Sequence, residues 1–427
     1  MLFAGPLLYP NEAARSSAGV TEGREAALAL HYSAAMAARR ATALAAALFV
    51  FGLGEELWFR YLPEYLRTLG ASAFLVGLFG TWKDLLDAVY AYPGGAITDR
   101  VGTRRSLLLF GSLTIAGIAL LLAKTSIAIV FAAMALVMAW SSLGLPATFA
   151  LIGEELEGHR RIVGFTVQSV VKRLPIVVAP PLGGLLLERL GVRGGMRVGF
   201  AISMVLSVAT LVVLARALAG GPGDTAARGS PPALRARPRL RPELRQLLVA
   251  DCLVRLCEGL PEVFLVVWAI EIVRITPARF GLLTSILMLT AIASYLPAAA
   301  LAKRAEKKPF VILTYVFFTL FPLAVVASRS FGALAAAFAV GGLREIGEPA
   351  RKALIVDLAD PAARARTVGL YYTLRGLAVA GAAAVGGALW TIRPTLTFFV
   401  AAALGAAGTA WAAAFLPARP PGLEETR

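Results

Sequence analysis

The chain has 427 residues, of which 58% are hydrophobic and only 16% are charged, and its mean hydropathy is +0.74. Soluble proteins average about 25% charged residues, so this composition excludes an ordinary soluble enzyme, and it excludes intrinsic disorder as well. The apolar runs are long and continuous, which disfavours a membrane β-barrel. The composition therefore predicts an all-α membrane protein that crosses the bilayer many times.

The formal net charge is +16, which in a soluble protein would suggest nucleic-acid binding. Here the basic residues lie between the apolar runs, and this distribution is the positive-inside pattern of membrane proteins. We therefore expect the lipid bilayer, and no nucleic acid, as a partner. Cys252 and Cys257 lie in one apolar run, at a spacing that fits neither a redox pair nor a metal site, so we expect no metal and no cofactor.

About twelve apolar segments of roughly 20 residues are long enough to cross a bilayer as helices. The chain thus divides into a six-span half at 39–217, a linker at 218–245 that is rich in Arg, Pro and Gly, and a second six-span half at 246–416. The predicted spans are 41–62, 72–95, 106–123, 126–148, 161–187, 195–217, 246–272, 278–302, 309–327, 331–352, 364–390 and 394–416.

The connections after the second, sixth and eighth spans are rich in Lys and Arg, whereas those on the opposite side are poorer in both. The positive-inside rule therefore places the linker and both termini, including the tail at 417–427, in the cytoplasm, and we expect the chain in the cytoplasmic (inner) membrane. We interpret residues 1–38 either as a disordered tail or as the product of a misplaced start site, since Met36 directly precedes the first span.

The two halves contain a sequence repeat at a constant shift. The segment Gly-Leu-Pro-Ala at 144–147 corresponds to Gly-Glu-Pro-Ala at 347–350, which lies 203 positions later. The pair Gly-Gly at 183–184 recurs at 386–387 with the same shift. Two parallel six-helix halves with a binding site at their interface are an architecture of membrane transporters.

A polar loop follows the second predicted span and reads Gly95-Ala-Ile-Thr-Asp99-Arg100-Val-Gly102-Thr-Arg104-Arg105. This segment resembles the signature loop of the major facilitator superfamily, Gly-x-x-x-Asp-Arg-x-Gly-x-Arg-Arg, and every defining position is filled. With six plus six spans, the resemblance covers nearly the whole chain. It implies two pseudo-symmetric six-helix bundles that transport a solute by alternating access.

The resemblance also implies a gating role for this loop. Asp99 would contact a helix end or a basic group of the other half, and Arg104 or Arg105 would pair with Glu154 or Glu155 at the end of the fourth span. Such contacts would hold one conformation closed and break on switching. A loop that only sets membrane topology would explain the arginines, but it would not explain Asp99 between two glycines.

Charged residues inside the predicted spans cost about 2.5–3.5 kcal/mol each at the bilayer centre, so we expect them to face a cavity or one another. The third, sixth, ninth and twelfth spans have none at their centres, which fits helices that flank a cavity. Several charges of the seventh span are spaced to lie along one helix face. The candidate substrate and proton residues are Glu55, Glu56, Lys83, Asp84, Asp87, Lys172, Arg173, Arg255, Glu258, Glu262, Arg344, Glu348 and Arg375.

Two roles compete for these residues. They form buried ion pairs that hold the helices in register, or some of them bind the substrate and a coupling proton. For the proton we favour Glu55 and Glu258, which occupy equivalent positions of the repeat. For the charge of the substrate we favour Lys172, Arg173 and Arg375.

The leading interpretation is a monomeric secondary transporter of a small organic solute, coupled to protons. Export is favoured because Ala179-Pro-Pro-Leu-Gly-Gly184 is close to the Gly-Pro-x-x-Gly-Gly of drug exporters, although the fourth span lacks their arginine. The charged spans favour the alternative, uptake of a polar or anionic metabolite. A membrane enzyme is disfavoured because no catalytic or phosphate-binding motif occurs, and a non-transporting sensor because both termini are short.

Overall fold

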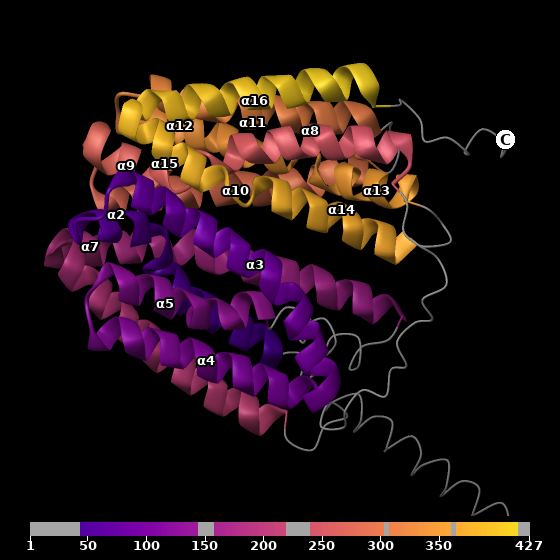
Figure 1. Ribbon diagram of the computed structural model, residues 1–427. Coiled ribbons are helices and arrows are strands. Elements are labelled where there is room, and N and C mark those ends of the chain that lie inside the picture. The colour runs from indigo at the N-terminus through magenta and orange to yellow at the C-terminus, as the bar shows by residue number, and fades with distance from the viewer. Residues whose placement is uncertain (1–42, 144–157, 219–239, 303–306, 360–363, 417–427) are drawn as a thin grey trace, which may run out of the picture.

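The computed structural model describes residues 43–143, 158–218, 240–302, 307–359 and 364–416, and within these ranges the chain forms helices and no strand. The described helices group into twelve spans that form two bundles of six, one from each half of the chain (Figure 1). The predicted all-α architecture of two six-helix bundles is therefore confirmed.

In the first half, a helix at 43–56 continues through two short helices as the first span. The fifth and sixth spans form one helical segment that turns at Gly191, where φ is +71°. This left-handed backbone conformation favours glycine, and it separates the two spans where the sequence predicts a connection. The elements are η1 (Phe59–Tyr61), α2 (Leu62–Thr68), α3 (Ala73–Val101), α4 (Thr103–Ala123), α5 (Ile127–Met138), η2 (Ala139–Leu143) and α7 (Gly158–Ala217).

In the second half, the seventh, tenth and eleventh spans are each built from shorter helices joined by turns. The first of these helices begins at Pro242 rather than at residue 246, because proline fits the first helical turn, where its missing N–H is not needed. The elements are α8 (Pro242–Gly259), α9 (Phe264–Val267), η4 (Trp268–Ile272), α10 (Pro277–Ala302), α11 (Lys307–Ala327), α12 (Phe331–Gly342), η5 (Leu343–Glu345), α13 (Glu348–Leu358), α14 (Arg364–Val379), α15 (Ala382–Ile392) and α16 (Pro394–Phe415).

The first and seventh spans are interrupted at equivalent positions. Leu57 lies in the turn before η1, and Leu260 lies in the turn between α8 and α9. A Cβ atom on Gly183 would lie 1.8 Å from the carbonyl oxygen of Leu57, and one on Gly386 would lie 2.1 Å from that of Leu260. The two contacts are related by the shift of 203 residues, so the packing shares the internal repeat seen in the sequence.

The two halves pack tightly against each other at the end away from the linker and the C-terminus (Figure 1). The hydroxyl of Tyr61 lies 2.7 Å from the carbonyl oxygen of Pro180 in its own half and 3.0 Å from that of Pro277 in the other half. A Cβ atom on Gly184 of α7 would lie 2.3 Å from the same Pro277 oxygen. We call this region the closed end.

Glycine also permits the second contact between the halves, where α3 meets α15. A Cβ atom on Gly77 would lie 2.4 Å from the carbonyl oxygen of Ala383, and one on Gly387 would lie 2.9 Å from that of Ala73. Toward the other end, which we call the open end, α3 and α14 diverge (Figure 1). The molecule is therefore closed at one end and divided at the end that carries the basic loops.

Six of the described helices are long and apolar enough to cross a membrane by length and composition alone. The remaining spans of the described chain are those with charged residues, turns or π-helical segments, such as the seventh span with Asp251 and Glu262. These irregular spans are tolerated in a bilayer only where they line a cavity or are buried in protein. The functional site is therefore expected among these irregular spans.

Candidate functional site

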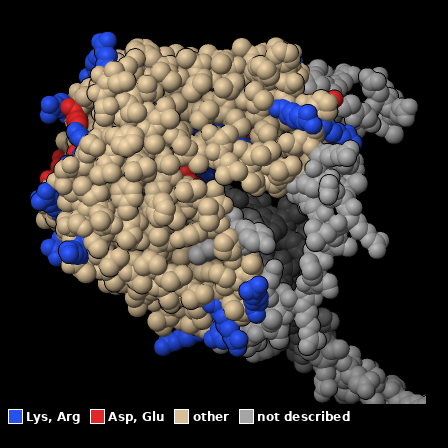
Figure 2. Space-filling model, in the orientation of Figure 1, with Lys and Arg blue, Asp and Glu red and all other residues tan. Residues whose placement is uncertain are grey.

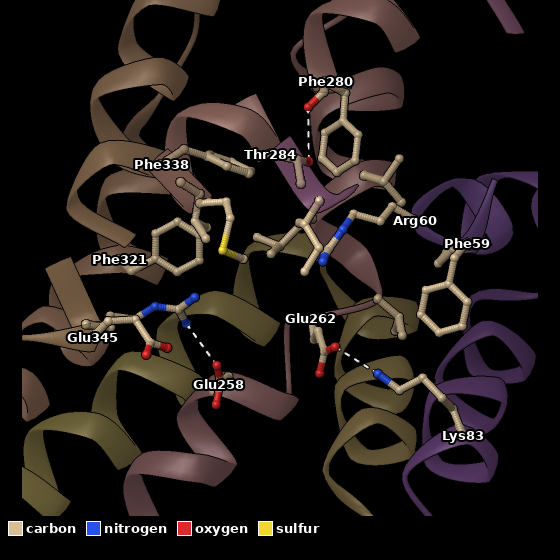
Figure 3. A pocket seen from close by; sticks show the side chains of 18 of the residues that line it. Phe59, Arg60, Lys83, Glu258, Glu262, Phe280, Thr284, Phe321, Phe338 and Glu345 are labelled. Atoms are coloured by element: carbon tan, nitrogen blue, oxygen red, sulfur yellow. Dashed lines mark hydrogen bonds and ion pairs between the residues drawn. The ribbon is translucent and has the colours of Figure 1, made fainter. Parts of the chain in front are cut away.

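A cavity of about 270 Å³ lies between the two halves, beside the interruption of the seventh span (Figure 3). We call it the central cavity. The first span, α3 and α7 form its wall in the first half, and the second half contributes α8 to α12 and η5. Its charged lining residues are Arg60, Lys83, Glu258, Glu262, Arg344 and Glu345, which lie among the aromatic residues Phe59, Phe79, Phe280, Phe321 and Phe338.

Lys83 and Glu262 join the two halves inside the central cavity (Figure 3). Nζ of Lys83, on α3, lies 2.8 Å from Oε1 of Glu262, in the turn between α8 and α9. The same Nζ lies 3.3 Å from Oδ1 of Asp84, so one base serves two acids. The Glu262 side chain is 46% exposed and that of Lys83 is 17% exposed, so the carboxylate is the more accessible partner.

Two further ion pairs cross the boundary between the halves. Nε of Arg67 lies 3.2 Å from Oε1 of Glu271, and Nη2 of Arg173 lies 3.1 Å from Oε2 of Glu345. In these pairs, as in the Lys83 pair, the base belongs to the first half and the acid to the second. Partly exposed pairs contribute about 1 kcal/mol or less each, so they favour this conformation without locking it.

A network of buried charges lies within the second half. The Asp251 carboxylate on α8 is 1% exposed, and its Oδ2 lies 2.6 Å from Nη1 of Arg351 and 3.3 Å from Nη1 of Arg375. The same oxygen accepts a hydrogen bond of 2.9 Å from the hydroxyl of Tyr371. Arg351 also lies 2.8 Å from Glu348. Such a network is stable only while its members remain paired.

Arg255 connects this network to the central cavity. Its guanidinium contacts Glu348 and lies 2.6 Å from Oε2 of Glu258, whose other oxygen lies 3.3 Å from Nη1 of Arg344. Glu258 is therefore held between two arginines at the cavity wall. The network contains four arginines and three acids, and so it carries one positive charge in excess.

A second cavity, of about 750 Å³, lies between α3 and α14, and we call it the lateral cleft. Asp84 and Asp87 line it on α3, and Tyr372 and Arg375 line it on α14. Oδ1 of Asp87 accepts a hydrogen bond of 2.7 Å from the Ser142 hydroxyl. The guanidinium carbon of Arg375 lies 4.7 Å from the centre of the Tyr372 ring. Glu258 and Glu262 of the seventh span line both cavities, so the central cavity and the lateral cleft share a wall.

The predicted candidates largely gather around these two cavities. The lining residues among them are Lys83, Asp84, Asp87, Arg255, Glu258, Glu262, Arg344 and Arg375. Glu348 belongs to the buried network, and Arg173 pairs with a residue of the central cavity. Glu56 lies 2.8 Å from Nε of Arg60, which lines the same cavity. Glu55 is partly buried in the first span, and the side chain of Lys172 lies outside the described residues.

The predicted gating loop lies at the open end and is largely helical, because α3 continues past the predicted span end at residue 95 to Val101 and α4 begins at Thr103. Gly102 has a φ of +87°, which lets the chain turn between the two helices. Nη2 of Arg104 donates a hydrogen bond of 3.2 Å to the carbonyl oxygen of Ala215, in the last turn of α7. A cation at a helix C-terminus is favourable.

Glu154 and the Asp99 side chain lie outside the described residues, so the contacts predicted for each of them stay predictions. The remaining loop positions are Gly95 within α3 and the exposed Arg100 and Arg105.

Sequence reasoning missed four residues that join the halves. Arg67 and Glu271 are an ion pair, Glu345 pairs with Arg173, and Tyr61 bridges two carbonyl groups. Arg67 and Glu271 are within one residue of equivalent positions in the repeat. Their opposite charges could therefore have indicated a contact between the two halves. No pattern around Tyr61 distinguishes it from other aromatic residues of the spans.

The chain matches the family model of the Major Facilitator Superfamily over residues 44–270 and 247–427. A comparison with curated proteins finds no match. Among solved structures, a peptide transporter POT in complex with sulfate has 19% identity and a TM-score of 0.71, over 88% of this chain and 94% of that chain. A POT family transporter in complex with 5-aminolevulinic acid has 15% identity and a TM-score of 0.71, over 87% and 94%.

A third structure is similar along its whole length. It is a bacterial homolog to the human lysosomal transporter Spinster, in an inward-facing and unoccupied conformation, with 12% identity and a TM-score of 0.69, over 90% of this chain and 98% of that chain. At these identities the structural likeness shows the shared fold, and the family model covers nearly the whole sequence. The chain therefore belongs to the major facilitator superfamily, and it is a multi-pass membrane transporter rather than an enzyme.

Proposed function

We propose that this chain is a proton-coupled exporter of an organic molecule whose polar part carries both a positive and a negative charge. The observation that carries the proposal is the ion pair of Lys83 and Glu262, which joins the two halves inside the central cavity. A solute with a carboxylate and an ammonium group can replace this pair. Its carboxylate would bind Lys83 and its ammonium group would bind Glu262, so the solute would hold the halves together in place of the contact that it breaks.

The central cavity suits a polar group of the size of an amino acid or a dipeptide. Its volume of about 270 Å³ is slightly below the range of about 300–1,000 Å³ that is usual for ligand pockets, so it suits a small ligand group. Aromatic side chains such as Phe280, Phe321 and Phe338 surround the charged residues. Charge pairing is stronger in such surroundings than in water, because the local dielectric constant is lower.

Two structural relatives support this class of substrate. One is a peptide transporter, and another from the same family holds 5-aminolevulinic acid. A peptide with free termini and 5-aminolevulinic acid each combine an amino group with a carboxylate. Recognition of a zwitterion is thus inferred from the geometry of Lys83 and Glu262, and the relative that holds 5-aminolevulinic acid binds a molecule with the same two groups.

Alternating access requires the open end and the closed end of the molecule to open in turn. We infer that the open end faces the cytoplasm, because it carries the basic loops and the positive-inside rule places these loops there. To expose the cavity to the other side, the halves must separate at the closed end, where Tyr61 and the pair of Arg67 and Glu271 join them. Such rocking of one half against the other is the usual movement of transporters built from two repeats.

Glu262 is the proton acceptor in this mechanism. A proton on Glu258 would disturb contacts with two arginines of its own half, whereas a proton on Glu262 releases its contact with Lys83 in the other half. The geometry therefore favours Glu262 over Glu258, which the sequence favours together with Glu55. Since a proton and the ammonium group of the solute compete for one carboxylate, protons and solute move in opposite directions. An inward proton gradient then drives export.

The test uses the full chain in proteoliposomes loaded with a pH-sensitive dye. Alanine, dialanine and 5-aminolevulinic acid are compared with propionate and propylamine, which carry one charge each. We expect flux of the zwitterions only, with protons moving in the opposite direction. Lys83→Ala and Glu262→Gln abolish this exchange, whereas the exposed controls Lys124→Ala and Glu188→Gln retain it. Protons that move with the solute would contradict the competition at Glu262, and equal flux of the singly charged compounds would contradict zwitterion recognition.

A further inference from the structure

The lateral cleft interrupts an otherwise apolar face of the molecule. Figure 2 shows tan surface over most of this face, charged side chains at its two ends, and a few red and blue atoms at a slot in the middle. In the view of Figure 1, the slot lies between the first and second bundles, where α3 faces α14. The charged residues that line the cleft are Asp84, Asp87, Arg255, Glu258, Glu262 and Arg375.

The rim of the cleft is apolar and exposed. Leu85 is 37% exposed and Val89 is 53% exposed on α3, and Leu377 on α14 is 62% exposed. All three line the cleft, and their helices are the second and eleventh spans. Exposed leucine and valine side chains on two spanning helices suit contact with the acyl chains of a bilayer. The cleft thus brings an apolar rim and charged groups together on one face of the molecule.

The two walls of the cleft differ in charge. On the α3 wall, Asp84 shares the ammonium group of Lys83 with Glu262, and Asp87 accepts a hydrogen bond from a hydroxyl group. On the α14 wall, Arg375 belongs to the network that has one arginine more than it has acids. The first wall thus favours a cationic group, and the second wall favours an anionic group.

We propose that the lateral cleft admits a single-chain amphiphile with a zwitterionic polar group directly from the bilayer. The anionic group faces Arg375, the cationic group faces Asp84 and Asp87, and the chain extends past Leu377 into the lipid. Because Glu262 lines both cavities, the polar group reaches the Lys83 pair from the cleft. Transport of this amphiphile rests on the proposed function. Its binding in the lateral cleft does not depend on the proposed function.

The binding test uses the full chain in lipid nanodiscs and a photoreactive 2-aminododecanoic acid with a diazirine in its chain. We expect labelling concentrated on residues 85–89 of α3 and 373–379 of α14, as mapped by peptide mass spectrometry. In Asp87→Asn/Arg375→Gln, this labelling falls about tenfold or more, since a hydrogen bond to a charged group contributes about 1.5–3 kcal/mol. Leu377→Trp, which fills the rim, reduces it as well. Leu289→Trp, at an exposed position of α10 outside both cavities, retains it.

Competing compounds test which part of the amphiphile is recognised. Unlabelled 2-aminododecanoic acid is expected to displace the label, whereas dodecanoic acid and dodecylamine displace it poorly because each has one charge. Alanine has the same polar group without a chain and is also a poor competitor. Labelling spread evenly over the lipid-facing helices, or equal competition by dodecanoic acid, would overturn the proposal.

The labelling experiment, read together with the transport assay, distinguishes failure of the lateral cleft as a binding site from failure of the proposed function. Transport of alanine that depends on Lys83, together with no focal labelling of the cleft, overturns the lateral cleft as a binding site and leaves the transport mechanism standing. Focal labelling together with no zwitterion flux overturns the transport mechanism and leaves the cleft standing. For variants with reduced labelling, thermal unfolding in the nanodisc confirms that the protein is folded.

Discussion

Lys83 and Glu262 are far apart in the sequence, and their charged atoms lie 2.8 Å apart across the boundary between the two halves. Each residue is held by a different bundle, so their contact reports directly on how the bundles sit against each other. A double-mutant cycle with Lys83→Met and Glu262→Gln is therefore expected to show a coupling of about 1 kcal/mol. Thermal unfolding of the substrate-free protein in nanodiscs measures it. Strictly additive effects would show that the pair does not stabilise this conformation.

Gly77 controls how closely the halves approach at the closed end. A methyl group at this position would lie 2.4 Å from the carbonyl oxygen of Ala383 in the other half. Gly77→Ala is therefore expected to disfavour this conformation by about 1–3 kcal/mol, the usual cost of overpacking. Spin labels at the exposed Arg100 and Lys352 would then move closer together as the open end closes.

The matched control for this experiment is Gly369→Ala, because a Cβ atom at Gly369 would meet no atom within 4 Å. This variant should leave the distance between the two spin labels unchanged. If Gly77→Ala also leaves the distance unchanged, the contact between α3 and α15 does not determine the conformation.

Arg351 is expected to be structural. Its side chain is 2% exposed and pairs with Asp251 and Glu348, whose side chains are 1% and 6% exposed. Arg351→Met would leave buried acids with less compensation, and breaking a buried pair in this way costs about 3–5 kcal/mol. A lowered midpoint of thermal unfolding measures the effect, with the exposed Arg189→Met as control. An unchanged midpoint would show that the network is hydrated and contributes little to stability.

Glu258→Gln separates the two candidate proton acceptors. Because Glu258 contacts two arginines of its own half, we expect this variant to keep the exchange of protons for solute, with reduced stability. Glu262→Gln should lose the exchange. Proton flux per transported solute in dye-loaded proteoliposomes distinguishes the two. Loss of coupling in Glu258→Gln alone would assign the proton to Glu258, which the sequence favours together with Glu55.

Asp99→Asn tests the gating loop. The family resemblance of this loop predicts that Asp99 helps to close the open end when the transporter switches. The variant should therefore transport more slowly while its affinity for the solute stays within a few-fold. Initial rates of exchange and equilibrium binding measure the two effects separately. An unchanged rate would remove the gating role from Asp99.

The fold was predictable because hydrophobic length and charge between spans are properties of the chain itself. The turn at Gly191 falls between the fifth and sixth predicted spans, and the interruptions at Leu57 and Leu260 follow the internal repeat. The spans without central charges also behave largely as predicted. In the described residues α4 and α16 line neither cavity, whereas α11 contributes Phe321 to the central cavity.

The pairing of the charges was less predictable. The cost of a charge in the bilayer indicates that Glu258, Glu262 and Lys83 need partners, but it does not indicate which partners. Partner choice depends on the rotation of each helix and on the separation of the halves, and these are set by contacts far away in the sequence, such as Gly77 with Ala383. For the same reason the roles of Glu258 and Glu262 were not separable from their spacing alone.

Among the described residues, the three ion pairs that cross the boundary have a common polarity, with the base in the first half and the acid in the second. A protein built from two similar halves could in principle assemble from two copies of either half. At the shift of 203 residues, the first-half positions equivalent to the three acids are Phe59, Thr68 and Ser142, and the second-half positions equivalent to the three bases are Ile286, Ile270 and Gly376. Two first halves would therefore leave the bases without acidic partners, and two second halves would leave the acids without basic partners. The polarity therefore specifies the partner of each half during assembly, and it disfavours swapped dimers in which equivalent halves of two chains meet.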